Sequence, residues 1–477
     1  MQAMTCQLGV IMAVIDVPIV GQSYHLKDWA IDCQRTINLY PQAVESGNAP
    51  QVSALIPTPG LIKKYELDGG AIRGMYALTD RVLVVAGGKL YTIDKIGAVL
   101  EIGAIAGVNR VTFADNSLHV MIVGAAAYKY TIANNTLTQI SGEEFFGASD
   151  VTVLDSRLVW TVPKSGRIQW SGLLNTETTA LSYATAETKS DDLVRTIANG
   201  GQLWLIGEKT TEIWSSTGDA NMPFQRMSGA FIPVGCIAKD SVCQFGQSLV
   251  WLSQSDAGRG QIVMTQGYQA QRISNHAIEY EIASYSRIDD AYSFAYQEHG
   301  HSFLLMTFPS AKKTWCFDST TNMWHERSFY NAETNKHEQH RAASYCYFMN
   351  AHLVGDRLNG NVYELTPSAQ TDDGASILRE RITPVINPHG TRLIFNELEL
   401  IAQVGQETGI DPQIILDWSD DRGKTWSRSQ QQSLGKIGEY GKRVIFRRLG
   451  QSFGRVFRIR MSDPVRLVIT GAKVKLR

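Results

Sequence analysis

Short apolar strands recur along the middle of the chain, each opened by a small or polar turn and answered by a second strand. The spacing between successive first strands is 36, 40, 45, 46, 54 and 50 residues. Self-similarity at such a period is typical of repeat architectures. The pattern therefore predicts seven β-hairpins in series, with first strands anchored at Val82, Leu118, Leu158, Leu203, Leu249, Phe303 and Leu353.

Turn residues fill the gaps within these pairs, as in Gly87-Gly88 and Asn359-Gly360-Asn361. One hairpin cannot bury both of its faces, but radial stacking covers each sheet with its neighbour, and closure removes exposed strand edges. The fold class is therefore all-β, with a β-propeller of seven blades, or six if one hairpin lies outside the ring. A set of separate sandwiches built from the same hairpins is the alternative.

Two segments fall outside the repeat. Residues 1–70 contain proline-bearing extended stretches and predict an N-terminal arm that leads into the first blade. The repeat occupies 71–377, and residues 378–477 predict a C-terminal β-sandwich-like module. The strands expected in that module are 394–401, 414–418, 444–449, 456–461 and 465–476.

Charge is distributed unevenly along the 477 residues, although the net charge is only −1. Residues 422–477 hold 15 Lys and Arg against 2 Asp and Glu, a net of +13, so the rest of the chain carries −14. Such asymmetry predicts that the C-terminal end faces DNA phosphates or an acidic partner, with an ordinary solvated face as the alternative. Strand alternation puts Arg458 and Arg460 on one face. The candidate residues are Arg443, Arg447, Arg448, Arg455, Arg458 and Arg460.

The cysteines and the apolar segments indicate a chain made in a reducing cytoplasm. Six cysteines are scattered without a CxxC pair, which favours buried thiols over a disulfide framework or a zinc site. Residues 8–20 are interrupted by Asp16 and Pro18 and lack a basic start, so they read poorly as a signal peptide.

The sharpest local motif is an Asp-box, formed by Ser419, Asp421, Gly423, Thr425 and Trp426. Its Ser and Asp side chains are suited to bond the turn backbone, and its Gly to a left-handed conformation. The motif resembles hairpin turns of sialidases and other β proteins, where it is structural. It therefore predicts a turn and no catalytic site.

Catalytic, metal and cofactor sites are not expected. A sialidase-like hydrolase would need three arginines for a carboxylate and a Tyr–Glu pair, and no such set is assignable on the blades. His337 and His340 are one residue short of HExxH and fall in a polar stretch that we expect to be a solvated loop. His299 and His301 likewise predict no metal, and nucleotide-binding and acyl-transfer motifs do not occur.

Phrases at both ends of the chain resemble the tail hub or nozzle proteins of short-tailed phages, the packaged-DNA stabilisation family. They are Arg35-Thr36-Ile37-Asn38-Leu39-Tyr40-Pro41, Pro59-Gly60-Leu61-Ile62-Lys63-Lys64-Tyr65, Gly87-Gly88-Lys89-Leu90-Tyr91, Lys442-Arg443-Val444-Ile445-Phe446-Arg447-Arg448-Leu449-Gly450, Phe457-Arg458-Ile459-Arg460 and Ser462-Asp463-Pro464-Val465.

The resemblance implies a non-enzymatic virion protein made in the host bacterial cytoplasm. It further implies a hexameric ring below the portal-adaptor that continues the DNA channel, retains the packaged double-stranded DNA, and anchors tailspikes or fibres and a needle or plug. The alternatives are a sialidase-like glycan hydrolase and a propeller scaffold for protein interactions.

Overall fold

The computed structural model describes residues 13–25, 32–44, 52–186, 189, 191–386, 391–406 and 409–477. Within these ranges strands dominate, and the helices are α1 (His276–Ser284) and the 3-10 turn η1 (Lys239–Ser241). The predicted all-β class is confirmed. In the described part of the chain, no helix has the length and apolar character needed to cross a membrane.

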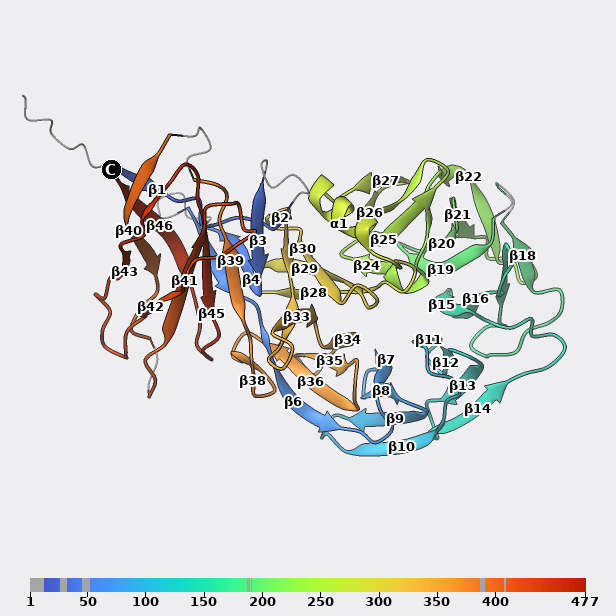
Figure 1. The fold of residues 1–477 in the computed structure, drawn as a ribbon. Helices are drawn as coiled ribbons and strands as arrows, with labels where there is room; N and C mark the ends of the chain where they lie inside the picture. Colours follow the sequence, from blue (N-terminus) through green and yellow to red (C-terminus); the bar gives the residue numbers. More distant parts are fainter. Residues whose placement is uncertain are drawn as a thin grey trace, which may run out of the picture. The chain divides into compact units, whose positions relative to one another are not determined.

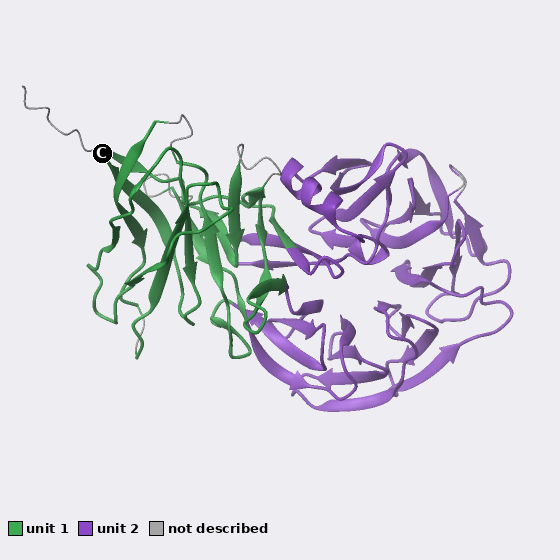
Figure 2. Ribbon diagram, in the orientation of Figure 1, with its two compact units in different colours: residues 1–60, 315–338, 367–477 green, residues 61–314, 339–366 purple. Residues whose placement is uncertain are grey.

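The chain divides into two compact units (Figure 2). Unit 1 consists of Met1–Gly60, Trp315–Glu338 and Pro367–Arg477, and unit 2 of Leu61–Thr314 and Gln339–Thr366. Because each unit draws on separated parts of the chain, the predicted sequence boundaries at 70 and 377 stay predictions.

Unit 2 consists of antiparallel sheets whose strands follow in chain order and surround a common centre (Figures 1 and 2). The first two sheets contain β7 (Ile72–Ala77), β8 (Arg81–Ala86), β9 (Lys89–Asp94) and β10 (Val99–Ala104), then β11 (Thr112–Asp115), β12 (His119–Val123), β13 (Ala127–Thr131) and β14 (Thr136–Ile140). The next two contain β15 (Asp150–Leu154), β16 (Arg157–Thr161), β17 (Arg167–Trp170) and β18 (Tyr183–Thr185), then β19 (Leu193–Asn199), β20 (Gln202–Gly207), β21 (Thr211–Ser216) and β22 (Phe224–Ile232).

The remaining strands of unit 2 complete its ring. They are β23 (Gly235–Cys236), β24 (Cys243–Phe245), β25 (Ser248–Ser255), β26 (Gly258–Gln266) and β27 (Gln269–Arg272), then β28 (Tyr292–Glu298) and β29 (His301–Phe308), and last β34 (Ala342–Phe348), β35 (Ala351–Asp356), β36 (Asn361–Thr366) and β6 (Gly60–Glu66). The last sheet therefore joins strands from the two sequence ends of the unit, as propeller closure requires.

Packing on both faces of β8 explains its unbroken apolar sequence. Val82 and Val84 belong to a buried cluster shared with the last sheet, including Leu353. Leu83 and Val85 belong to the cluster shared with the second sheet. Each fully buried Val or Leu of this kind contributes about 1.5–3 kcal/mol. The first sheet is therefore covered on both sides, as predicted for radial stacking.

Six of the seven predicted anchors lie inside strands, at exposures of 4% or less. Leu118 is the exception, because Ser117 has φ 76° and the Asn116 side chain accepts from the His119 amide, which places the turn through Leu118. Leu118 is 51% exposed, and Val120 takes the core position. In the sixth hairpin, β30 (Lys313–Asp318) begins in unit 2 and continues in unit 1, and the number of blades stays a prediction.

Unit 1 contains the predicted β-sandwich, here built from two sheets. One contains β1 (Ala13–Asp16), β4 (Leu39–Ala43), β5 (Ser53–Pro57), β40 (Leu393–Ala402), β43 (Val444–Arg447), β44 (Gln451–Ser452) and β46 (Ile469–Leu476). The other contains β2 (Tyr24–His25), β3 (Cys33–Ile37), β31 (Met323–Glu326), β39 (Arg379–Ile382), β41 (Gln413–Ser419), β42 (Gln430–Ser433) and β45 (Val456–Met461). Smaller strands are β32 (Ser328–Asn331), β33 (Lys336–Gln339), β37 (Thr371–Asp372) and β38 (Ala375–Ser376).

Inward side chains from both sheets form one core, in which Leu398 and Phe446 of the first sheet meet Leu416 and Phe457 of the second. The described parts of the predicted N-terminal arm are extended and contribute strands to this sandwich. β1 pairs with β46, and β3 pairs with β39. The arm therefore belongs to the sandwich as far as β5, with Leu39 and Leu55 in its core, whereas β6 belongs to the last sheet of unit 2.

Candidate functional site

The Asp-box forms the turn after β41 that the sequence predicts. Ser419 Oγ accepts from the Gly423 amide at 2.7 Å, and Asp421 accepts from the Thr425 amide at 2.8 Å and the Thr425 hydroxyl at 2.6 Å. Gly423 has φ 91°, in the left-handed region that favours glycine. Bonds from the Thr425 side chain and backbone hold the pKa of Asp421 at about 2. All of these hydrogen bonds lie within the turn, so the motif stabilises the turn.

Arg455 is the most deeply buried of the six candidate arginines, with its side chain 1% exposed. Its guanidinium donates to both carboxylate oxygens of Asp420, at 2.7 and 2.9 Å. The same group lies over the rings of Phe395, at 4.5 Å, and Trp418, at 5.3 Å. Arg455 therefore fixes the Asp-box turn to β45 and is not available to a partner in this chain.

Arg458 and Arg460 lie on the same face of β45, as alternation predicts. Both donate to Asp417 Oδ2, from Arg458 Nη2 at 2.9 Å and from Arg460 Nη2 at 2.6 Å. Asp417 is buried, and the Trp426 ring lies 4.0 Å from the Arg458 guanidinium carbon. The side chains of Arg458 and Arg460 are 19% and 26% exposed, so only a small part of each is accessible to solvent.

Arg443 directly precedes β43 and Arg447 ends it, and both lie beside glutamates of β40. Arg443 makes a two-point contact with Glu399, both bonds at 2.6 Å, and this pair holds the pKa of Glu399 below its usual value. Arg447 Nε lies 3.5 Å from Glu397, which Lys475 approaches at 3.7 Å. Both arginine side chains are about two-thirds exposed. On this face of the sandwich, acidic side chains of β40 therefore lie beside basic side chains of the neighbouring strands.

Arg448 differs from the other five, because it follows β43 in a left-handed turn with φ 59° and is exposed. Across the described residues, no carboxylate lies within ion-pair distance of it. The same holds for a further group of exposed basic side chains on the sandwich. That group consists of Lys424, Arg428, Lys436, Arg466 and Lys473.

Partner carboxylates change the predicted charge of the module. Asp417, Asp420, Glu397 and Glu399 all precede residue 422, so a count that starts there misses them. Over 378–477 the sequence has 18 Lys and Arg and 10 Asp and Glu, a net of +8. The alternation of Glu397 and Glu399 on a predicted strand was the sequence pattern that could have indicated carboxylates facing the arginines.

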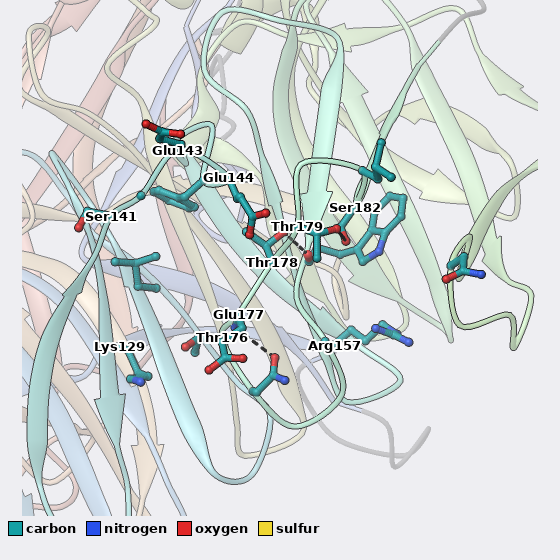
Figure 3. A pocket seen from close by; sticks show the side chains of 18 of the residues that line it. Lys129, Ser141, Glu143, Glu144, Arg157, Thr176, Glu177, Thr178, Thr179 and Ser182 are labelled. Carbon is teal, nitrogen blue, oxygen red and sulfur yellow. Dashed lines mark hydrogen bonds between the residues drawn. The ribbon is translucent and has the colours of Figure 1, made fainter.

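A polar groove in unit 2, of about 1050 Å³, lies between β14 and the loop that follows β17 (Figure 3). Glu143, Glu144 and Glu177 line it, and their carboxylates have no bonded partner among the described residues. Arg157 is the one arginine in the lining and donates to the Ser171 carbonyl at 2.9 Å. The groove therefore lacks the three arginines that a sialidase-type site would need.

The histidines of both predicted clusters take part in local structure, and in the first cluster His301 is buried and stacks on Phe303. His337 lies in β33, in a hairpin rather than the expected solvated loop, and shares a 2.8 Å hydrogen bond with Ser328 Oγ. His340 is buried, and its Nδ1 accepts a hydrogen bond from the Ala342 amide. Nowhere in the described ranges do three or more His, Cys, Asp or Glu gather as metal ligands would.

The chain was compared with solved structures, curated sequences and protein families. Solved structures that are similar include the WD40 domain of Pan2 from Neurospora crassa, at 8% identity, covering 65% of this chain and 95% of that chain with a TM-score of 0.40. Another is BamB from Moraxella catarrhalis, at 12% identity, covering 69% and 97% with a TM-score of 0.36. Among curated protein sequences, none matches the chain.

Two family models match nearly the whole chain. The model described as bacteriophage P22 Gp10, beta-propeller, matches residues 16–370, and the one described as bacteriophage P22 Gp10, beta-sandwich, matches residues 378–477. This agrees with the propeller, the sandwich and the resemblance at both chain ends. The chain therefore belongs to the P22 Gp10 family of structural phage tail proteins, which is not an enzyme family.

Proposed function

We propose that six copies of this chain form the hub or nozzle ring of a short phage tail, below the portal-adaptor. Family membership makes the chain a virion component that assembles with other tail proteins. The proposal adds that the ring continues the DNA channel, retains the packaged genome, and anchors tailspikes or fibres and a needle or plug. Synthesis in the host cytoplasm agrees with five described cysteines that are all free.

Exposed positive charge on the C-terminal segment of the sandwich carries this proposal. That segment, 378–477, has a net charge of +8, whereas 1–60, 315–338 and 367–377 each have −2, so the positive charge of unit 1 is local to its C-terminal strands. A ring of six such segments attracts DNA phosphates without reading sequence, in a salt-dependent way. Acidic tails of an adaptor would be attracted by the same rule.

The contacts divide the six candidate arginines by role. Arg455 is buried, and Arg458 and Arg460 share Asp417, so these three hold the sandwich together. Arg443, Arg447 and Arg448 are the exposed ones. We therefore assign the DNA-facing or adaptor-facing role to this second group, together with the unpaired basic side chains around it.

Charge reversal of three unpaired residues tests the role in genome retention. The variant R428E/R448E/R466E breaks no ion pair of the described structure, so its fold should survive. Virions that carry it should release DNA faster on heating than wild-type virions, as followed by uptake of a DNA-binding dye.

The matched control reverses three exposed basic residues of unit 2, in K95E/K164E/R226E, for the same change in net charge. Control virions should keep their DNA like the wild type. Equal release from both variants would show that total charge matters and that the sandwich surface does not. Particles that lack the chain and still keep their DNA would refute genome retention altogether.

A further inference from the structure

An aromatic pocket in unit 2 has no part in the surfaces described above. It has a volume of about 480 Å³, within the range of about 300–1,000 Å³ that is usual for small-molecule sites. Its lining comes from β24, β28, β34 and β35, which belong to three neighbouring sheets of the unit. The lining residues are Gln244, Phe245, Gly246, Ala295, Tyr296, Gln297, Tyr345, Tyr347 and His352.

Local sequence explains why three of these rings share one wall. Tyr345 and Tyr347 are two residues apart on β34 and so point to the same face. The turn to β35 has two central residues at positive φ, Met349 at 49° and Asn350 at 59°, as in a tight two-residue hairpin. That turn sets His352 directly opposite Tyr347.

Neighbouring rings and one hydrogen bond fix the orientation of Tyr345 and His352. Phe294 stacks on Tyr345 with centroids 5.5 Å apart and planes 10° from parallel. A 2.9 Å hydrogen bond joins Tyr345 Oη to His352 Nδ1, and the Tyr347 ring lies 5.1 Å from the imidazole. Tyr296 is buried beneath, whereas Tyr347 is 53% exposed. The site is therefore a supported aromatic platform with one ring open to solvent.

Chemistry of the lining limits the ligand class. None of the lining residues is Asp, Glu, Lys or Arg, so nothing there would offset a charged ligand. Burial lowers the pKa of His352, which keeps its imidazole neutral at pH 7. Flat rings suit the C–H faces of a sugar, and amides both donate to and accept from its hydroxyls.

We propose that this pocket binds a neutral saccharide, with Tyr347 stacked on the sugar ring and Gln244 and Gln297 bonded to its hydroxyls. Both glutamines are exposed at the rim. A proline-rich peptide also suits aromatic grooves, but its backbone carbonyls need donors alone, whereas the glutamine amides present acceptors as well. The inference is independent of the ring and of genome retention.

Saturation-transfer NMR on the full chain tests the proposal with defined probes. The probes are glucose, galactose, mannose and N-acetylglucosamine, with glucuronic acid as the charged comparison and a proline decapeptide as the peptide comparison. At least one neutral sugar should receive saturable transfer at its ring C–H protons. Affinity should fall about fivefold in Tyr347→Ala, the loss expected for one aromatic contact.

Tyr280→Ala is the matched control, because Tyr280 is a 42% exposed tyrosine on α1, away from the pocket. It should bind as the wild type does, and near-ultraviolet circular dichroism should show that both variants are folded. Absence of transfer to any neutral sugar would overturn the proposal. So would an affinity that Tyr347→Ala leaves unchanged, equal binding of glucuronic acid, or binding of the decapeptide alone.

Discussion

Replacing Arg455 by alanine should destabilise the sandwich much more than replacing Arg443, although both arginines are paired with a carboxylate. The Arg455 side chain is 1% exposed, whereas that of Arg443 is 65% exposed. Arg455 also donates to the Leu449 carbonyl and lies over two aromatic rings. The contrast tests whether the candidate arginines divide into structural and surface groups.

The expected magnitude follows from these contacts. A buried carbonyl left without its donor costs about 1–3 kcal/mol. Loss of the desolvated contacts with Phe395 and Trp418 adds about 1–2 kcal/mol. Asp420 is 46% exposed and regains water, so its own penalty is small. Together these give about 2–5 kcal/mol for Arg455→Ala, against about 0.2–1 kcal/mol for the exposed pair of Arg443.

Thermal unfolding followed by tryptophan fluorescence is the assay, because two tryptophans of the sandwich lie against its arginines, Trp418 against Arg455 and Trp426 against Arg458. A change of 1 kcal/mol shifts the midpoint of a folding unit of 150–250 residues by about 2–4 °C. We therefore expect Arg455→Ala to lower the midpoint by about 4–20 °C and Arg443→Ala by less than about 4 °C.

Arg455→Lys refines the test, since lysine keeps the charge and loses the two-point contact with Asp420. Its midpoint should fall between the wild type and Arg455→Ala. If Arg455→Ala shifts the midpoint no more than Arg443→Ala does, the assignment of Arg455 to the sandwich interior is refuted.

Two further predictions concern single turns and close approaches. The pKa of Asp421 is held at about 2, below its ordinary 3.8, so its stabilisation is complete above that ordinary value and is lost as pH falls towards 2. Asp421→Ala should remove this part of the pH dependence of the unfolding midpoint, and an unchanged acid profile would contradict it. Gly360→Ala should destabilise unit 2 strongly, because a Cβ there would lie 1.8 Å from the Leu67 carbonyl oxygen. Gly88→Ala is the control, since its Cβ would meet only Ile105 O at 3.9 Å, and equal midpoints for the two variants would count against the close approach.

Local patterns predicted most of the propeller, because each hairpin is specified by nearby residues. β8 and β9 are joined by Gly87-Gly88 and bury Val82, Val84 and Leu90. Leu118 was placed wrongly because Ser117 adopts a left-handed conformation that its residue type does not signal. Pairings between distant segments, such as β1 with β46, leave no local signal either.

The candidate site was predicted less well, because a charged side chain in a sequence looks like a surface residue. Arg455 is buried only because Asp420, Phe395 and Trp418 surround it, and Phe395 is 60 residues away in sequence. The aromatic pocket has the same origin. Tyr345-Cys346-Tyr347 indicates a shared face, but Tyr296 and Phe245 reach it from other sheets.

Native mass spectrometry of the full chain with the portal-adaptor ring of its own phage tests the central claim most directly. We expect a complex that gains six chains of 52.8 kDa each, whether or not the chain is a monomer when alone. Binding of one chain, of any number other than six, or no binding to the adaptor would contradict the proposed hub ring.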